Sequence, residues 1–141
     1  MALIYPKNPI FSNESEEKVY NYIEKKLPKE YIAYYNYNID IKEFDFCLFI
    51  PFKGVLIIEV KSWIADNIKH IIDNNFVLYK TQEGEKTLRS PYKQAEGYSY
   101  KMIKELKKRV PGNVLVLPVV CYTNITEEEY LEKRLDIISP K

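Results

Sequence analysis

The clearest structural signal in the chain is the segment Val55-Leu56-Ile57-Ile58-Glu59-Val60-Lys61-Ser62-Trp63. Four apolar residues lead into an acid and a base that stand two positions apart. Side chains alternate between the two faces of a strand, so Glu59 and Lys61 share the face of Val55 and Ile57. An acid and a base at the end of an apolar strand are costly to bury unless they have partners. This strand is therefore where a site is expected.

The segment before it supplies a second acid. Residues Glu43–Phe52 are predicted to form a strand, which the turn signal Pro51–Gly54 folds back onto the strand at 55–63. In the alternating pattern, Asp45 lies on the face opposite its apolar neighbours. These neighbours are Phe44, Phe46 and Leu48.

The length of the turn decides whether the two acids meet. A symmetric four-residue turn places Asp45 opposite Val60 and puts Asp45 and Glu59 on different faces. An odd-length turn or a bulge places Asp45 opposite Glu59 instead. Directly opposed residues share a face, with Cβ atoms roughly 4.5–5.5 Å apart.

Converging carboxylates at Asp45 and Glu59 favour a metal site. They repel one another unless a cation or a proton lies between them, and hard oxygen ligands suit Mg²⁺. A nearby lysine, here Lys61, can orient an attacking water and neutralise charge that grows on phosphorus. These parts suit metal-assisted phosphodiester hydrolysis. The alternative is a surface ion pair between Glu59 and Lys61, with Asp45 as a solvated acid near a turn.

Periodicity and turn residues predict the other elements. They are a helix from Glu16 that ends at Pro28, a strand at Tyr31–Ile41, a hairpin of Ile68–Ile72 with Phe76–Lys80, a loop at Thr81–Arg89, a helix from Ser90-Pro91 to Val110, a buried, central strand at Val114–Tyr122, a helix capped by Thr126, and a strand beginning at Ile137 and Ile138. The order α-β-β-β-hairpin-α-β-α predicts an α/β fold with a mixed sheet flanked by helices.

Composition narrows the class of protein. The chain has 141 residues, which suits a single domain over 1–141, and a formal net charge of +1, which excludes a polycationic wrapper of nucleic acid. Its 2 cysteines, Cys47 and Cys121, lie in apolar runs and are expected to be buried free thiols. The sequence contains neither a long apolar span nor a signal peptide, so a cytoplasmic protein without membrane contact is expected.

Asp45 followed by Glu59-Val60-Lys61 resembles the Asp…Glu-x-Lys signature of the PD-(D/E)xK nuclease superfamily. More closely, the chain resembles the nuclease-related domain (NERD) family, and the matching segments span about residues 15–122. These segments are Ser15-Glu16-Glu17-Lys18-Val19, Glu43-Phe44-Asp45, Ile58-Glu59-Val60-Lys61-Ser62-Trp63 and Ser90-Pro91-Tyr92-Lys93-Gln94.

The resemblance implies a restriction-endonuclease-like core and a Mg²⁺- or Mn²⁺-dependent nuclease that acts on DNA, with RNA as a second substrate to consider. It implies that Asp45, Glu59 and the carbonyl of Val60 hold the metal, that Lys61 positions the water or steadies the transition state, and that Gln94 completes the site. Glu16 would be a further metal or water partner. Its alternative role is a helix N-terminal charge that suits the helix dipole.

The resemblance has two departures. Trp63 is followed by Ile64-Ala65-Asp66-Asn67 rather than a glycine-containing turn, and Ser15 replaces the usual glycine before Glu16. Neither change affects the implied ligands. The family is often attached to a helicase, and activity of this domain could require such a motor or a second copy. The chain could also be a module of a longer protein.

The predicted helix at 90–110 offers a surface for nucleic acid. Lys101, Lys104 and Lys108 follow the spacing i, i+3, i+7 and form one stripe suited to phosphate contacts. The alternative is an ordinary solvated helix face. At the level of the whole chain, the alternative to a nuclease is a catalytically silent module with the same fold that binds nucleic acid or protein.

Overall fold

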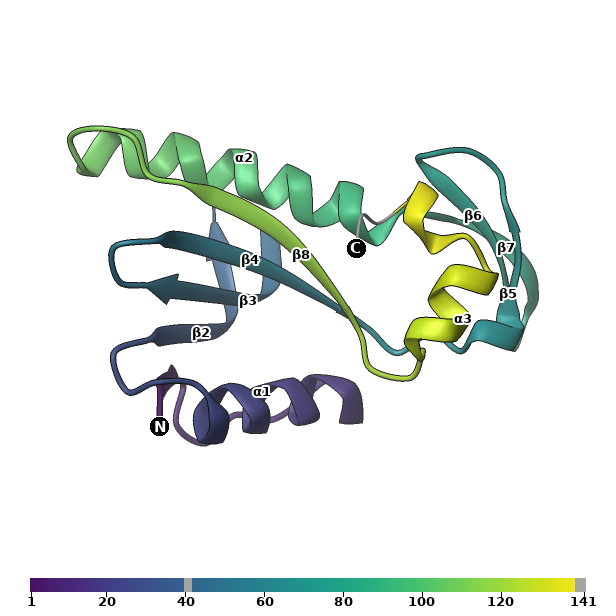
Figure 1. The fold of residues 1–141 in the computed structure, drawn as a ribbon, viewed down its shortest axis with the longest axis horizontal. Helices are drawn as coiled ribbons and strands as arrows, with labels where there is room; N and C mark the ends of the chain where they lie inside the picture. Colours follow the sequence, from purple (N-terminus) through teal and green to yellow (C-terminus); the bar gives the residue numbers. More distant parts are fainter. Residues whose placement is uncertain (40–41, 139–141) are drawn as a thin grey trace.

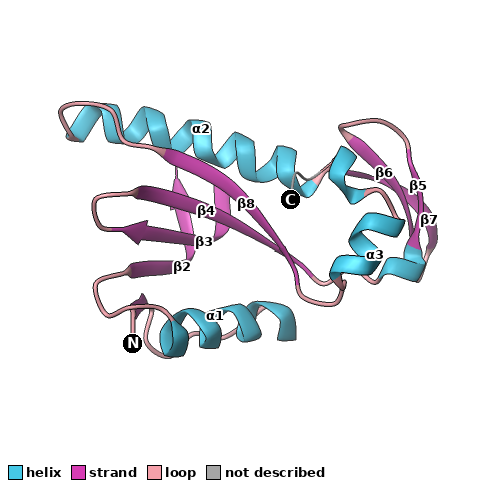
Figure 2. Cartoon of the chain, viewed as in Figure 1, coloured by secondary structure: helices cyan, strands magenta, loops and turns pink. Residues whose placement is uncertain are grey.

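Two β-sheets organise the chain in a computed structural model, which describes residues 1–39 and 42–138 but not the side chains of 37–43 (Figures 1 and 2). The predicted strand end at Ile41 and the side chain of Glu43 therefore lie outside the described residues. The elements are β1 (Leu3–Tyr5), α1 (Glu14–Lys26), β2 (Ile32–Ile39), β3 (Lys42–Ile50), β4 (Gly54–Lys61), η1 (Ala65–Asn67), β5 (Ile68–Ile71), β6 (Phe76–Thr81), β7 (Gly84–Arg89), α2 (Pro91–Arg109), β8 (Val116–Tyr122), α3 (Glu127–Glu132) and η2 (Leu135–Ile137).

The main sheet has the strand order β1-β2-β3-β4-β8. Strands β2, β3 and β4 form an antiparallel meander, while β1 pairs with β2 and β8 pairs with β4 in parallel. A parallel neighbour needs a crossover, and α2 lies within the connection from β4 to β8. The predicted mixed sheet flanked by helices is confirmed, with β1 as a strand that the hydropathy pattern did not predict.

The turn between β3 and β4 has an odd length. Ile50 pairs with Gly54 and Phe46 pairs with Ile58, so residues 51–53 form the turn. The backbone accommodates it with positive φ angles of 64° at Phe52 and 142° at Gly54. Continuing this register places Asp45 level with Glu59, as expected for an odd-length turn.

A helix covers each face of the main sheet (Figure 1). On one face, Tyr20 and Ile23 of α1 pack in one cluster with Phe46 and Ile58. On the other face, Met102 of α2 packs in a cluster with Cys47, Val55, Ile57 and Val116. Glu59 and Lys61 follow Val55 and Ile57 in the strand alternation, so they belong to the face that α2 covers.

The prediction that Phe44 shares a face of the sheet with Phe46 and Leu48 is wrong. Phe44 belongs to the cluster under α2, and its ring lies 6.4 Å from that of Tyr98, whereas Phe46 faces α1. The cause is a bend in the β2–β3 hairpin, where Asn36, the residue level with Asp45, has a φ of 54°. The distant ends of these strands rise toward α2 in Figure 1.

The predicted central position of Val114–Tyr122 is also wrong, because β8 is an edge strand of the main sheet. The apolar character of β8 reflects the burial of its two faces rather than a central position in the sheet. Val116 packs under α2 while Val119 and Cys121 pack on the cluster beside α1, so both faces are covered although one edge is unpaired. Pro118 in this strand fits an edge position.

Two further predictions fail, one in the second sheet, which has the strand order β5-β6-β7, and one near the C-terminal end of the described residues. Residues Gly84–Arg89, predicted as loop, form β7, whose polar residues are mostly exposed. The predicted strand at Ile137 and Ile138 is instead the 3₁₀ turn η2, because Leu135 and Ile138 bury their side chains at i, i+3 spacing. Both pack with Trp63 and Val77 in a separate cluster, here called the satellite cluster.

Both cysteines are free, as predicted, and burial raises the pKa of the Cys47 thiol to about 12 and also raises that of Cys121. Within residues 1–39 and 42–138, no helix combines the length and the apolar character needed to cross a membrane.

Candidate active site

The carboxylate of Asp45 binds the backbone of the neighbouring strand. Its Oδ2 accepts a hydrogen bond of 2.7 Å from the Val60 amide, just beyond Phe46–Ile58, the last pair that β3 forms with β4. The Asp45 side chain thus binds β4 at the point where the backbone pairing between β3 and β4 ends. This bond fixes Asp45 beside the segment that carries Glu59 and Lys61.

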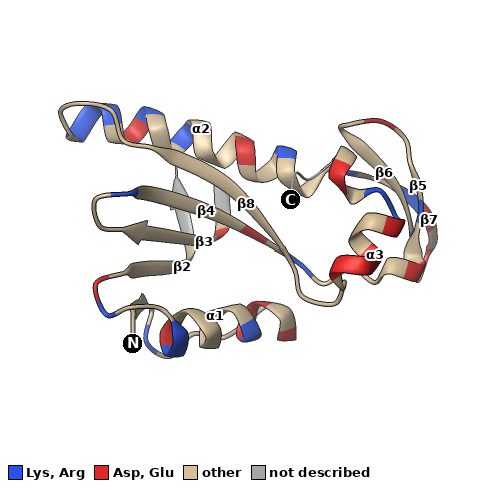
Figure 3. Cartoon of the chain, in the orientation of Figure 1, with Lys and Arg blue, Asp and Glu red and all other residues tan. Residues whose placement is uncertain are grey.

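Glu59 is a buried acid with one nearby base. Its residue is 7% exposed, and its Oε1 lies 3.4 Å from Lys61 Nζ. Burial, helped by the negative charges of Asp45 and Glu16, raises the pKa of Glu59 to about 7, although Lys61 opposes the shift. The charge of Asp45 thus adds to the cost of ionising Glu59. Figure 3 shows the acidic segment of β4 followed directly by a basic one.

Glu16 reaches this group of acids from α1. It is 5% exposed, its Oε2 accepts a 2.6 Å hydrogen bond from Asn13 Nδ2, and its own amide donates to Asn13 Oδ1 at 2.9 Å. The hydroxyl of Tyr35 accepts a hydrogen bond of 3.2 Å from the Ser12 amide, and the pKa of Tyr35 is raised by burial and by the negative charge of Glu16. Glu16 is thus a fixed group rather than a mobile surface charge.

Gln94 lies in the first turn of α2, the helix that covers the face of Glu59 and Lys61. Ser90 caps this helix by accepting a hydrogen bond from the Lys93 amide, and Pro91 follows at the first helical position, as predicted. Within the described part of the chain, Gln94 Oε1 is buried and has no hydrogen-bond partner. A buried acceptor without a partner is costly, and a bound ion or water would relieve that cost.

The predicted stripe of Lys101, Lys104 and Lys108 lies along the second half of α2, away from its first turn (Figure 3). Lys104 is exposed, whereas Lys108 Nζ lies 3.3 Å from Glu105 Oε1 and Lys101 is half-buried with a partner of its own. All three residues lie in one helix, but their amines do not have equal freedom to meet a ligand.

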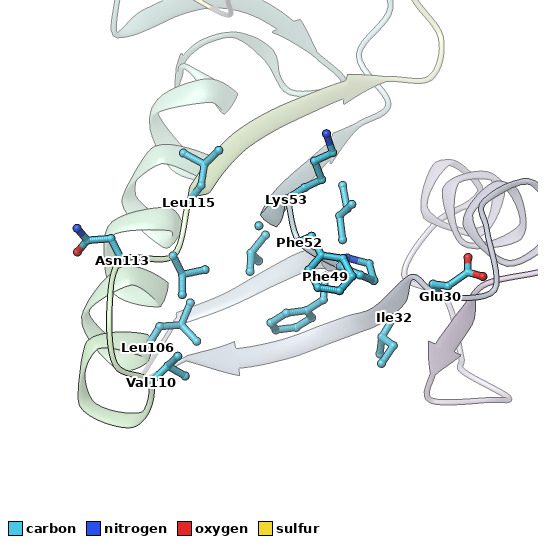
Figure 4. Close-up of a pocket in the computed structure, with 14 residues that line it drawn as sticks. Glu30, Ile32, Phe49, Phe52, Lys53, Leu106, Val110, Asn113 and Leu115 are labelled. Atoms are coloured by element: carbon cyan, nitrogen blue, oxygen red, sulfur yellow. The ribbon is translucent and has the colours of Figure 1, made fainter.

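A cavity of about 470 Å³ lies elsewhere, between the β3–β4 turn and the C-terminal end of α2 (Figure 4). Its lining is largely apolar and includes Phe49, Leu106 and Leu115, but none of the predicted site residues. The predicted site residues therefore lie outside this cavity.

Among the residues that the structure describes, no three histidine, cysteine, aspartate or glutamate side chains are arranged to hold a metal ion together. A metal at this site would have two carboxylate ligands, from Asp45 and Glu59. Other ligands would be neutral oxygens, such as Gln94 Oε1 and the Val60 carbonyl.

Sequence reasoning did not find the residues that surround Glu16. The spacing of Asn13 and Glu16 is that of a capping box and could have revealed their reciprocal bonds. Tyr35 gives no such signal, because its alternating strand pattern predicts packing only, and its side chain is indeed in the core. Trp63 is a packing residue, and its ring is stacked with that of Tyr79 at a centroid distance of 5.1 Å.

A comparison with family models connects this geometry with known proteins. The model described as "Nuclease-related domain" matches residues 12–123, a range that includes Glu16, Asp45, Glu59, Lys61 and Gln94. No curated protein and no solved structure gives a significant match. Because the family model covers well over half of the chain, the chain belongs to the nuclease-related domain family, and with it to the PD-(D/E)xK nuclease superfamily.

Proposed function

We propose that this domain hydrolyses phosphodiester bonds in DNA with the help of Mg²⁺ or Mn²⁺. One observation supports the proposal above all: Glu59 is buried beside Lys61, and burial together with the negative charge of Asp45 raises its pKa to about 7 although Lys61 Nζ lies 3.4 Å away. A fold gains little stability from such an arrangement, whereas functional sites commonly contain acids with raised pKa values.

The residues suit a hard divalent cation. Two carboxylates and neutral oxygens are the donors that Mg²⁺ and Mn²⁺ prefer. The repulsion that raises the pKa of Glu59 would be relieved by a cation between Glu59 and Asp45. The unpartnered Gln94 Oε1 offers a further oxygen, and the Val60 carbonyl completes the proposed ligands.

When bound, the metal lowers the pKa of a water ligand and polarises the phosphate oxygens. Lys61 is proposed to hold the attacking water in place and to neutralise charge on phosphorus, since its ammonium lies beside Glu59 and is only partly exposed. We assign Glu16 to a water partner rather than a metal ligand, because its carboxylate is already engaged by Asn13.

DNA is the proposed substrate because the family is nuclease-related and because α2 carries the lysine stripe at 101, 104 and 108. Phosphate contacts from such a stripe position a strand without reading its sequence. The rival function is a silent binding module, and the ion pair between Glu59 and Lys61 is compatible with it, since Lys61 offsets part of the Glu59 charge without any ligand.

Cleavage assays separate the two functions. The native protein is incubated with plasmid, linear and single-stranded DNA and with RNA, in Mg²⁺, Mn²⁺ or chelator. Asp45→Ala, Glu59→Ala and Lys61→Ala are compared with Glu83→Ala and Lys86→Ala, which disrupt an exposed ion pair in the β6–β7 turn. We expect metal-dependent cutting that only the first three variants lose. Binding without cutting, insensitive to chelator and to those variants, would establish the silent module.

A further inference from the structure

Three chain segments meet at Thr123, which follows β8. Its hydroxyl donates a hydrogen bond of 2.5 Å to the Ser15 hydroxyl, and its amide donates to the Lys61 carbonyl at 3.2 Å. Ser15 is 5% exposed, and 108 positions separate it from Thr123 in the sequence. The bond is therefore a long-range tie in a partly buried place.

The residues at this tie are next to the candidate site. Ser15 directly precedes Glu16, and Lys61 is the last residue of β4. Asn124 Nδ2 adds a hydrogen bond of 3.1 Å to the Ser62 carbonyl, which holds the following peptide as well. The first turn of α1 and the end of β4 are thus both fastened to the segment Thr123–Asn124.

We propose that Thr123 is a positioning residue that sets the distance between Glu16 on α1 and the Glu59–Lys61 pair on β4. This inference rests on the proposed nuclease function. The proposed role depends on the hydroxyl of Thr123, because that group makes the hydrogen bond between α1 and the segment after β8. A valine at 123 has a similar shape but cannot donate, whereas a serine keeps the donor.

The test compares Thr123→Val and Thr123→Ser with the native protein and with Thr81→Val. Thr81 is a matched control, because its hydroxyl also donates to an oxygen, Gly84 O at 2.8 Å, but in the β6–β7 turn. Hydrogen exchange of the first turn of α1, kcat, KM and Mn²⁺ affinity are measured. For Thr123→Val we expect faster exchange and a kcat about tenfold lower, with little change in KM or in Mn²⁺ affinity, because the metal ligands proposed above are not on α1. Thr123→Ser and Thr81→Val should resemble the native protein.

Exchange in α1 that Thr123→Val leaves unchanged would overturn the proposal, and so would a kcat equal to that of Thr81→Val. Ser15→Ala removes the same bond from the other side and carries the same test if Thr123→Val does not fold. A native protein that neither binds metal nor cuts any substrate would refute the proposed function instead. The exchange measurement would then still show whether Thr123 fixes the first turn of α1.

Discussion

At the scale of single residues, Glu59 is an acid whose charge is costly in the folded state. Its pKa rises from 4.5 to about 7, so between these values the folded protein keeps a proton that the unfolded chain has released. Stability therefore falls as the pH rises through this window, by about 3 kcal/mol in total. We predict that Glu59→Gln removes this loss, as measured by urea unfolding at pH 5 and pH 8. An unchanged pH dependence in the variant would contradict it.

Asp45 has two roles that substitution can separate. Asparagine keeps an oxygen that can accept from the Val60 amide but removes the charge, whereas alanine removes both. We predict that Asp45→Asn folds with native stability at pH 6 yet lowers cleavage by more than about a hundredfold. Asp45→Ala should lose a further 1–3 kcal/mol or so of unfolding free energy, because the Val60 amide loses its partner. Thermal unfolding and a cleavage assay check both, and equal stability of the two variants would refute the structural role.

The sequence was sufficient to propose Asp45, Glu59 and Lys61 as site residues but not to choose the register between β3 and β4. Alternation along a strand is a local rule, while the register depends on whether the turn has three or four residues, and Pro51–Gly54 allowed both. The tie between Ser15 and Thr123 was out of reach for a different reason. It joins side chains 108 positions apart, and only the folded chain brings them together.

At the scale of elements, local sequence signals correctly predicted the helices and strands with strong caps or clear periodicity. They failed for elements whose structure depends on contacts with the rest of the chain. Ser90 and Pro91 marked the start of α2 correctly because capping is a local interaction. The prediction of a central position for β8 is wrong because an apolar run indicates that both faces of a strand are buried. It does not indicate whether both edges are paired with other strands. The polar strand β7 gave no apolar signal, since only Leu88 within it is partly buried.

Gly54 allows β4 to begin close to β8. It has a φ of 142°, and a Cβ atom at this position would lie 2.3 Å from the Leu115 carbonyl oxygen. We predict that Gly54→Ala destabilises the fold by about 2 kcal/mol or more, because both backbone strain and a steric clash result. The control is Gly84→Ala in the β6–β7 turn, where φ is 113° but no atom lies within 4 Å of a Cβ. Comparable losses in urea unfolding would show that strain alone explains the effect.

The exposed Lys104 tests the role of α2 in binding nucleic acid. If its ammonium contacts a phosphate, Lys104→Ala should weaken binding to all sequences and lower the salt slope of the affinity by about 1. Fluorescence anisotropy with labelled DNA at several salt concentrations measures both. Lys26→Ala, at the exposed end of α1, is the matched control. The same slope for both variants would place the nucleic acid away from α2.

At the scale of the whole molecule, the satellite cluster is joined to the main sheet through the start of α2. Ser90 donates its hydroxyl to the Ile138 carbonyl at 2.5 Å and its amide to Asn75 O at 2.6 Å. Trp63, which follows β4, packs in the same cluster. The second sheet and the C-terminal turns therefore support both ends of the candidate site, at Lys61 and at Gln94.

This connection predicts a single cooperative unfolding transition. Leu135 is fully buried in the satellite cluster, so Leu135→Ala should lower the unfolding free energy by about 2–5 kcal/mol. Trp63 is the only tryptophan of the chain, and it reports on that cluster by fluorescence, while far-UV circular dichroism reports mainly on α1 and α2. Both transitions should shift together to lower urea concentration. A shift in the fluorescence transition alone would mean that the satellite cluster unfolds independently, and its support for Lys61 and Gln94 would then be lost before the main sheet opens.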